Sequence, residues 1–126
     1  MLLVDDDELI LRATVAALRH HEVVATTSPV EAVDRIRRGE RFDVVFCDAV
    51  MPELGGLDVF AAITAVAPEL ARHFVLLSGG LDAPTAAAAG DLGLPVLEKP
   101  FDLDDLEERI ERSRTPPVGS SERSRR

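Results

Sequence analysis

The chain has 126 residues, of which 46% are hydrophobic, and a formal net charge of −9 at pH 7. This length suits one compact domain, and no apolar run approaches the roughly 20 residues that a membrane-spanning helix needs. We therefore expect a single soluble domain that lies in the cytoplasm, because no secretory leader precedes it. The acidic charge repels phosphate backbones, so direct binding to nucleic acid is not expected.

Short apolar runs alternate with segments of helical period, which is typical of βα units around a parallel sheet. Five strands are expected, over residues 2–4, 23–26, 42–47, 74–77 and 94–97. One helix is expected after each strand. The first has apolar positions from Leu9 to Ala17, and the second runs from Pro29 to Gly39 after a capping box formed by Ser28 and Glu31. The other three are expected over residues 56–66, over residues 84–89 and from Asp102 onward. The alternation predicts a flavodoxin-like, doubly wound α/β fold with strand order 2-1-3-4-5.

The folded domain is expected to occupy residues 1–113, followed by a disordered polar tail over residues 114–126. The tail is rich in Ser, Arg, Pro and Gly, so it offers too little apolar burial to offset the entropy of ordering. The lone cysteine, Cys47, lies inside an apolar run and predicts a buried thiol. His20, His21 and His73 show no ligand spacing, so we expect them to be solvated and predict no zinc site.

Charged side chains stand where three of the predicted strands end. Asp5 and Asp6 follow the first strand, Asp48 follows the third, and the only lysine, Lys99, follows the fifth. In the predicted order the first and third strands are neighbours at the topological switch, so these carboxylates converge at one edge of the sheet. Because like charges raise one another's pKa values, a bound divalent cation is the simplest way to keep the carboxylates ionised. The all-oxygen donor set predicts Mg²⁺, with Mn²⁺ or Ca²⁺ as less selective occupants.

Phosphoryl transfer suits this set of groups, because that chemistry consists mostly of positioning the reactants and neutralising charge on the phosphoryl oxygens. A carboxylate can act as the nucleophile, so Asp48 is expected to attack the phosphorus in line. Lys99 and the hydroxyl of Ser78, which ends the fourth strand, are expected to bind phosphoryl oxygens beside the metal. The predicted catalytic residues are therefore Asp48, Ser78 and Lys99.

Each of these residues also has an ordinary structural interpretation when it is taken alone. An acidic run before a helix stabilises the helix N-terminus, and an aspartate after a strand often binds backbone amides. A single serine or lysine at such a position is commonplace. Only the joint placement of these groups on four strand ends favours a functional site.

Four motifs in this order resemble a response regulator receiver domain: Leu3-Val4-Asp5-Asp6-Asp7, Phe46-Cys47-Asp48-Ala49-Val50-Met51-Pro52, Leu77-Ser78-Gly79 and Glu98-Lys99-Pro100-Phe101. The resemblance covers about residues 1–113. It implies a site built from the phosphoacceptor Asp48, the Mg²⁺ ligands Asp5 and Asp6 with the backbone carbonyl of Val50, and the hydroxyl and amine of Ser78 and Lys99. It also implies a cis peptide bond between Lys99 and Pro100.

The resemblance implies a signalling domain of a two-component phosphorelay rather than an enzyme that acts on other substrates. The phosphoryl donor is expected to be a histidine kinase or a histidine phosphotransfer protein, and the domain is expected to catalyse only its own phosphorylation and dephosphorylation. Val96 stands where many receivers carry Tyr or Phe, so a muted aromatic switch is expected. The Gly79-Gly80 pair and the brief helix predicted after this pair resemble the corresponding segment of receivers in hybrid sensor histidine kinases. No oligomeric state follows from the sequence.

Three other functions use similar elements. A Mg²⁺-dependent phosphohydrolase of the haloacid dehalogenase type places its nucleophile after the first strand and a second aspartate two residues on, which Asp5 and Asp7 fit. The chain is short for such an enzyme, and no later acidic pair follows a strand beyond Asp48. A flavodoxin-like electron carrier needs a phosphate-binding loop where this chain has acids. A receiver that only binds partners is disfavoured by the intact set of matching residues.

Overall fold

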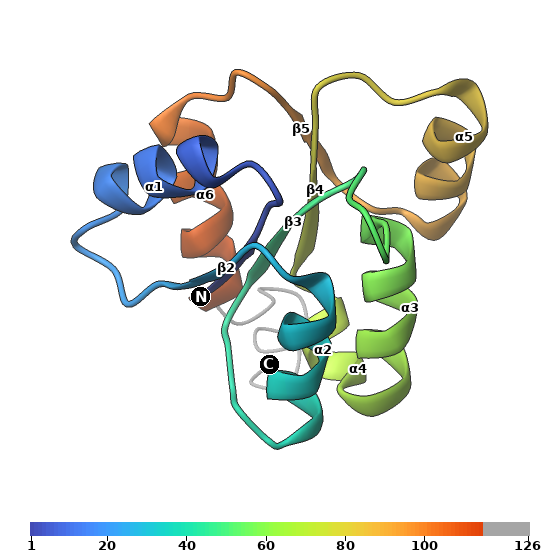
Figure 1. Cartoon of the computed structure of the whole chain (residues 1–126), viewed down its shortest axis with the longest axis horizontal. Helices are drawn as coiled ribbons and strands as arrows, with labels where there is room; N and C mark the ends of the chain where they lie inside the picture. Colours follow the sequence, from blue (N-terminus) through green and yellow to red (C-terminus); the bar gives the residue numbers. More distant parts are fainter. Residues whose placement is uncertain (115–126) are drawn as a thin grey trace, which may run out of the picture.

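The computed structural model describes residues 1–114 as a five-stranded parallel sheet between two layers of helices (Figure 1). The strands lie in the order β2-β1-β3-β4-β5. Their bounds are β1 Leu2–Val4, β2 Val24–Thr26, β3 Val45–Asp48, β4 Phe74–Ser78 and β5 Val96–Glu98. The predicted fold class and strand order are confirmed, with small shifts at the strand ends.

Within residues 1–114 six helices cover the sheet, where five are predicted from the sequence. They are α1 Glu8–Ala17, α2 Pro29–Arg37, α3 Gly56–Val66, α4 Pro68–Ala71, α5 Ala83–Leu92 and α6 Leu103–Arg114. The predicted number is wrong because Pro68, which follows α3, begins the additional short helix α4. Proline suits a first helical position, since its missing N–H would have no partner there. The helix predicted as brief, α5, has ten residues because Asp82 caps its start and Gly93, at φ 69°, ends it.

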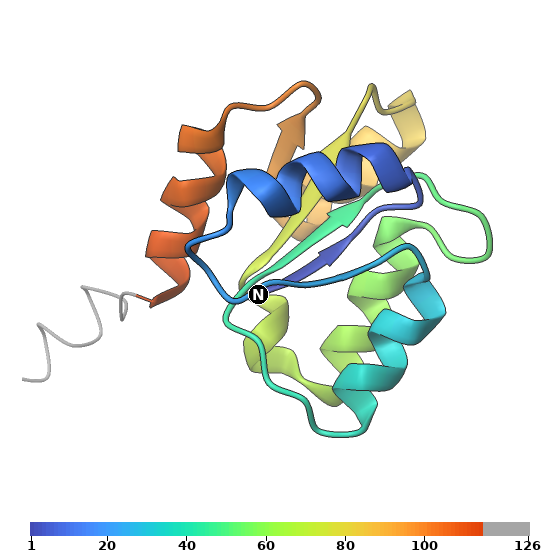
Figure 2. The same ribbon diagram turned by 60° about the vertical axis from the view of Figure 1, so that its left-hand side comes forward.

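Alternate side chains of the strands pack on opposite faces of the sheet, and each face is covered by its own helices (Figure 2). Leu2 and Leu76 belong to the core beneath α2, α3, α4 and α5. Leu3 and Leu77 belong to the core beneath α1 and α6. All four residues of β3 are buried, and the buried thiol of Cys47 confirms that prediction. With both faces covered, polar groups of the sheet collect at the strand ends.

The start of α2 departs from the predicted capping box in one respect. Ser28 Oγ accepts a hydrogen bond from Glu31 N at 3.1 Å, as predicted. The Glu31 carboxylate, however, accepts from Thr26 Oγ1 at 2.7 Å and not from the Ser28 backbone. The Ser28 N–H instead donates to Thr26 Oγ1 at 3.0 Å. Thr26 therefore connects the end of β2 to the start of α2.

His21 is not the solvated surface residue that the sequence predicts. Its side chain is only 12% exposed, and its Nε2 lies 2.8 Å from Glu107 Oε1 on α6. Arg114, at the end of α6, lies with Nη2 3.3 Å from His21 Nδ1. Arginine is always a donor, so Nδ1 accepts and the ring carries its proton on Nε2, which donates to Glu107. His21 thus ties the segment after α1 to α6.

Replacing His21 by alanine is expected to lower the free energy of unfolding by about 1–2 kcal/mol, because the half-buried hydrogen bond to Glu107 is lost. The adjacent His20 is exposed, so His20→Ala should change that free energy by less than about 0.5 kcal/mol. Urea denaturation of both variants at one pH measures the difference. Equal stabilities of the two variants would contradict this assignment.

Part of the predicted tail lies outside the described residues. Arg114 is the last residue of α6, and residues 115–126 are beyond the part of the chain that the structure describes. Within residues 1–114, no helix has the length and apolar character needed to cross a bilayer. The domain boundary at residue 113 and the cytoplasmic location stay predictions.

Candidate functional site

Three carboxylates meet where the neighbouring strands β1 and β3 end. Asp5 directly follows β1, Asp6 comes next, and Asp48 is the last residue of β3. One oxygen atom from each of these side chains lies within 4.8 Å of the others. Val4 pairs with Cys47 in the parallel register, so the residues that follow leave the sheet side by side. The convergence predicted from the strand order is present.

The only lysine of the chain joins this carboxylate cluster. Lys99 Nζ lies 2.9 Å from Asp5 Oδ2 and 3.2 Å from Asp48 Oδ1. Its backbone N–H donates to the Ser78 carbonyl at 2.6 Å, which holds the residue at the end of β4. The Lys99–Pro100 peptide bond is cis, as the resemblance implies. One ammonium group therefore faces two carboxylates, and the cluster as a whole keeps an excess of negative charge.

Burial and repulsion shift the protonation of the cluster. Asp48 is 7% exposed, and burial followed by the charge of Asp5 raises its pKa from 3.8 to about 6, although Lys99 opposes the rise. Burial alone lowers the pKa of Lys99, but the close ion pair with Asp5 and the charge of Asp48 outweigh burial and leave the pKa above 10.5. A cation bound among the carboxylates would remove the repulsion that raises the pKa of Asp48.

The donor atoms fit a hard divalent cation. Asp5 is fully buried, and its Oδ1 accepts a hydrogen bond from Asp7 N at 2.9 Å. Among residues 1–114 its Oδ2 has no hydrogen-bond partner and forms only the ion pair with Lys99. A buried carboxylate oxygen left in this way, beside two more carboxylates, suits an ion such as Mg²⁺. Asp6 is exposed, so the cluster is open to solvent on its side.

Asp7 caps a helix and does not join the carboxylate cluster. Its Oδ1 accepts hydrogen bonds from Leu9 N at 3.0 Å and Ile10 N at 3.2 Å, and so caps α1. It is not one of the clustered carboxylates. The phosphohydrolase alternative pairs Asp5 with Asp7, and it lacks its second aspartate in this structure.

The two remaining predicted site residues, Ser78 and Val50, lie at the same end of the sheet as the carboxylates. Ser78 ends β4 and is buried, and its Oγ accepts from Gly80 N at 2.8 Å. Among residues 1–114 its own proton has no hydrogen-bond acceptor, so it is available to a ligand. Val50 lies two residues after Asp48 in the loop before α3, with an exposed side chain. Within residues 1–114 neither residue forms a hydrogen bond with the three carboxylates. The roles of Ser78 and Val50 stay predictions.

Gly56, which sequence reasoning missed, lets α3 approach the backbone of Asp48. A Cβ at this position would stand 2.7 Å from the Asp48 carbonyl oxygen and 2.6 Å from Leu76 Cδ2. The Gly56 N–H donates to the Ala49 carbonyl at 2.9 Å, so the first residue of α3 is bonded to the loop that follows β3. The signal in the sequence was the paired glycines before a helical segment.

Gly56→Ala is expected to lower the free energy of unfolding by about 2 kcal/mol, because Cβ would overlap backbone that cannot move without displacing Asp48. Gly90→Ala in α5 is the matched control, since its Cβ would meet nothing within 4 Å. That substitution should raise stability by up to about 1 kcal/mol. Urea unfolding and the Asp48 amide resonance measure the two effects. A Gly56→Ala protein with unchanged stability and an unmoved Asp48 signal would refute the close-approach argument.

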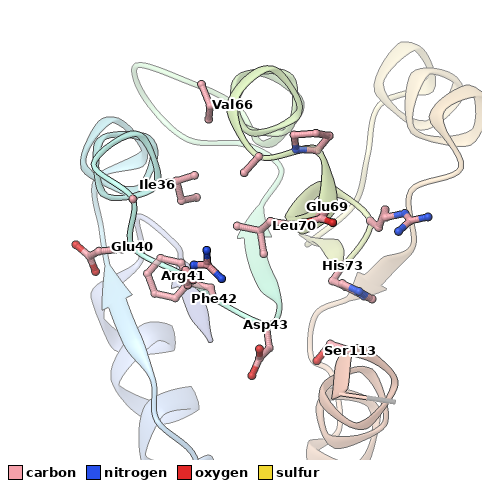
Figure 3. A pocket seen from close by; sticks show the side chains of 14 residues that line it. Ile36, Glu40, Arg41, Phe42, Asp43, Val66, Glu69, Leu70, His73 and Ser113 are labelled. Carbon is pink, nitrogen blue, oxygen red and sulfur yellow. The ribbon is translucent and has the colours of Figure 1, made fainter. Parts of the chain in front are cut away.

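A hollow of about 720 Å³ lies at the opposite end of the sheet, between the end of α2 and α4 (Figure 3). Ile36 and Leu70 point into it, and charged side chains such as Glu40 and Arg41 lie at its edge. None of the predicted site residues lines it. The candidate chemistry therefore belongs to the open carboxylate cluster and not to this hollow.

Comparisons with known proteins find similar chains. A family model described as the response regulator receiver domain matches residues 1–111. The chain is 34% identical over 124 residues to the DNA-binding transcriptional regulator NtrC of Azospirillum brasilense, a match that covers 94% of this chain and 25% of that protein. It is 32% identical over 120 residues to the response regulator receiver protein CpdR of Brucella abortus (strain 2308), covering 89% of this chain and 93% of that protein.

A solved structure has a similar fold. The crystal structure of a response regulator receiver domain protein from Clostridium thermocellum matches with a TM-score of 0.79 and 28% identity, covering 89% of this chain and 90% of that one. The chain spans about half or less of the length of several curated relatives, NtrC among them. These matches therefore describe a domain and not the remainder of such longer proteins.

Proposed function

This chain belongs to the response regulator receiver domain family of two-component systems, and from that premise we propose that Asp48 is its phosphoacceptor. The observation that carries the proposal is the gathering of three carboxylates and the only lysine at one end of the sheet. The family consists of signalling receivers and not of classical enzymes. We infer that this domain catalyses only its own phosphorylation and dephosphorylation.

The proposed reaction begins with Asp48 in its ionised form. With a pKa of about 6, the carboxylate is mostly ionised at neutral pH. One of its oxygens attacks the phosphorus of a phosphohistidine on a histidine kinase or a histidine phosphotransfer protein. The new O–P bond forms as the N–P bond breaks, and the imidazole leaves with the electron pair of that bond. Attack of water on the same phosphorus later returns the carboxylate and releases inorganic phosphate.

Lys99 and Ser78 are proposed to bind the phosphoryl oxygens. The Lys99 ammonium lies 3.2 Å from Asp48 Oδ1, so it is close enough to stabilise the negative charge on the oxygens of a phosphoryl group bound to Asp48. Ser78 Oγ would donate its free proton to another phosphoryl oxygen. Mg²⁺, when held by Asp5, Asp6, Asp48 and the backbone carbonyl of Val50, supplies further neutralisation of that charge.

The proposed partner is a histidine-containing phosphodonor, and no nucleic acid contact is assigned to residues 1–114. The net charge of −9 opposes such a contact. NtrC is named as DNA-binding, but the match covers 25% of that protein, so this property is not transferred to the present chain. The resemblance to receivers of hybrid sensor histidine kinases stays a prediction. One of its two grounds, the brief helix predicted after Gly79-Gly80, is wrong because α5 has ten residues.

Intact-mass measurement after incubation with acetyl phosphate and Mg²⁺ tests the proposal. The wild type is expected to gain the mass of one phosphoryl group, and hydroxylamine should remove it because an aspartyl phosphate is an acyl phosphate. Asp48→Asn should not be labelled, whereas Asp43→Asn, at an exposed aspartate before β3 and at the opposite end of the sheet, should be labelled like the wild type. An unlabelled wild type, under conditions that label a known receiver, would contradict the proposal.

A further inference from the structure

The backbone of Asp5 is anchored to the last residue of an edge strand. Asp5 N donates to the Thr26 carbonyl at 3.2 Å, and Val4 is paired with Thr26 in the register of β1 and β2. β2 has three residues and lies at one edge of the sheet. The ends of short edge strands open readily, because no strand pairs with their outer side. The position of Asp5 therefore depends on how firmly Thr26 is held.

The hydroxyl of Thr26 provides that restraint. Thr26 is buried, and its Oγ1 donates to Glu31 Oε1 at 2.7 Å while it accepts from Ser28 N at 3.0 Å. A hydroxyl has one proton and two lone pairs, so it satisfies both partners at once. Glu31 is oriented in turn by Arg35, whose Nη2 lies 3.6 Å from Glu31 Oε2. The hydroxyl thus fastens the end of the edge strand to the first turn of α2.

We propose that Thr26 is a positioning residue that holds Asp5 beside Asp48 and Lys99. Asp5 has little freedom to adapt by itself, because its side chain is fully buried. Its Oδ1 accepts from Asp7 N at 2.9 Å, and its Oδ2 lies 2.9 Å from Lys99 Nζ. A shift of the Asp5 backbone would therefore displace both carboxylate oxygens. This inference rests on the proposed function, since the site that Thr26 supports is the proposed metal and phosphoryl site.

Three substitutions separate the hydroxyl from the rest of the residue. Thr26→Val removes the hydroxyl but keeps the branched shape, the strand preference and the backbone carbonyl that binds Asp5. Thr26→Ser restores a hydroxyl at the same position. Thr27→Val makes the same change at the adjacent, exposed threonine and is the matched control.

Amide hydrogen exchange without metal and a Mg²⁺ titration are the two measurements. The Val45 amide, in the central strand β3, donates to the His73 carbonyl at 3.0 Å, so its exchange reports opening of the interior of the sheet and hence of the whole domain. In Thr26→Val the ratio of the Asp5 exchange rate to the Val45 exchange rate is expected to rise about tenfold. The dissociation constant for Mg²⁺ should also rise about tenfold, as is usual when an outer partner of a metal ligand is lost. Thr26→Ser should restore both values, and Thr27→Val should change neither.

Two results would overturn the role of Thr26. An unchanged exchange ratio in Thr26→Val would show that the hydroxyl serves general stability only, and an unchanged Mg²⁺ affinity would show that it does not position Asp5 for the ion. Failure of the wild type to bind Mg²⁺ would instead refute the metal site of the proposed function. In that case the exchange ratio, which is measured in a chelator, still decides whether Thr26 holds Asp5.

Discussion

Lys99→Met is expected to slow phosphoryl uptake from acetyl phosphate by about 10²–10³-fold, the usual effect of removing one group that stabilises developing charge. Methionine keeps an unbranched apolar side chain but lacks the ammonium that lies 2.9 Å from Asp5 and 3.2 Å from Asp48. Lys99 also opposes the rise in the pKa of Asp48. Without it that pKa moves further above about 6, and less of the nucleophile is ionised at neutral pH.

The initial rate of mass gain at saturating Mg²⁺ measures this effect. Lys99→Arg keeps the positive charge and should react faster than Lys99→Met, but slower than the wild type because a planar guanidinium does not reproduce a compact ammonium. Alkaline pH restores ionisation of Asp48 without restoring the missing charge, so Lys99→Met should stay slow there. A methionine variant that is labelled at the wild-type rate would remove Lys99 from the proposed reaction.

The carboxylate cluster could be predicted because it depends on few facts about the fold. Once the strands are parallel and β1 lies next to β3, acids at their carboxyl ends must share one edge of the sheet. Lys99 follows the parallel strand β5 and so reaches the same edge of the sheet as Asp48, although the two residues are 51 positions apart. The strand order does not decide whether Asp6 or Asp7 joins Asp5. The decision is local, because the Asp7 carboxylate caps α1 and only Asp6 remains for the cluster.

The wrong predictions concern contacts and turns that leave no periodic pattern in the sequence. His21 and Glu107 are 86 residues apart, and their local surroundings do not indicate which segment packs on α6. The helix α4 has four residues, which is too short for apolar periodicity to reveal. Of the two hydrogen bonds of the predicted capping box, only the one from Glu31 N to Ser28 Oγ is present. Thr26 Oγ1 replaces the other, because it donates to the Glu31 carboxylate and accepts from the Ser28 N–H.

The Asp48 carboxylate is expected to lower the stability of the metal-free protein increasingly as the pH rises from about 4 to about 6, and Asp48→Asn is expected to remove this contribution. Below pH 3.8 the Asp48 carboxyl is protonated in the folded and the unfolded chain, so it contributes nothing. Between the two pKa values the unfolded chain releases the proton while the folded chain retains it, so a rise in pH favours unfolding. Above about pH 6 both forms are ionised and the full penalty, roughly 2–3 kcal/mol, is present.

Urea unfolding in a chelator, from about pH 4 to about pH 7, measures this difference between the wild type and Asp48→Asn. At neutral pH the variant should be the more stable protein, and added Mg²⁺ should stabilise the wild type more than the variant because the ion offsets the repulsion among the carboxylates. Asp43→Asn, at an exposed site, should follow the wild-type profile. Parallel profiles for the wild type and Asp48→Asn would contradict the raised pKa. A buried carboxylate that weakens the unliganded fold is expected where selection has acted on chemistry more strongly than on stability.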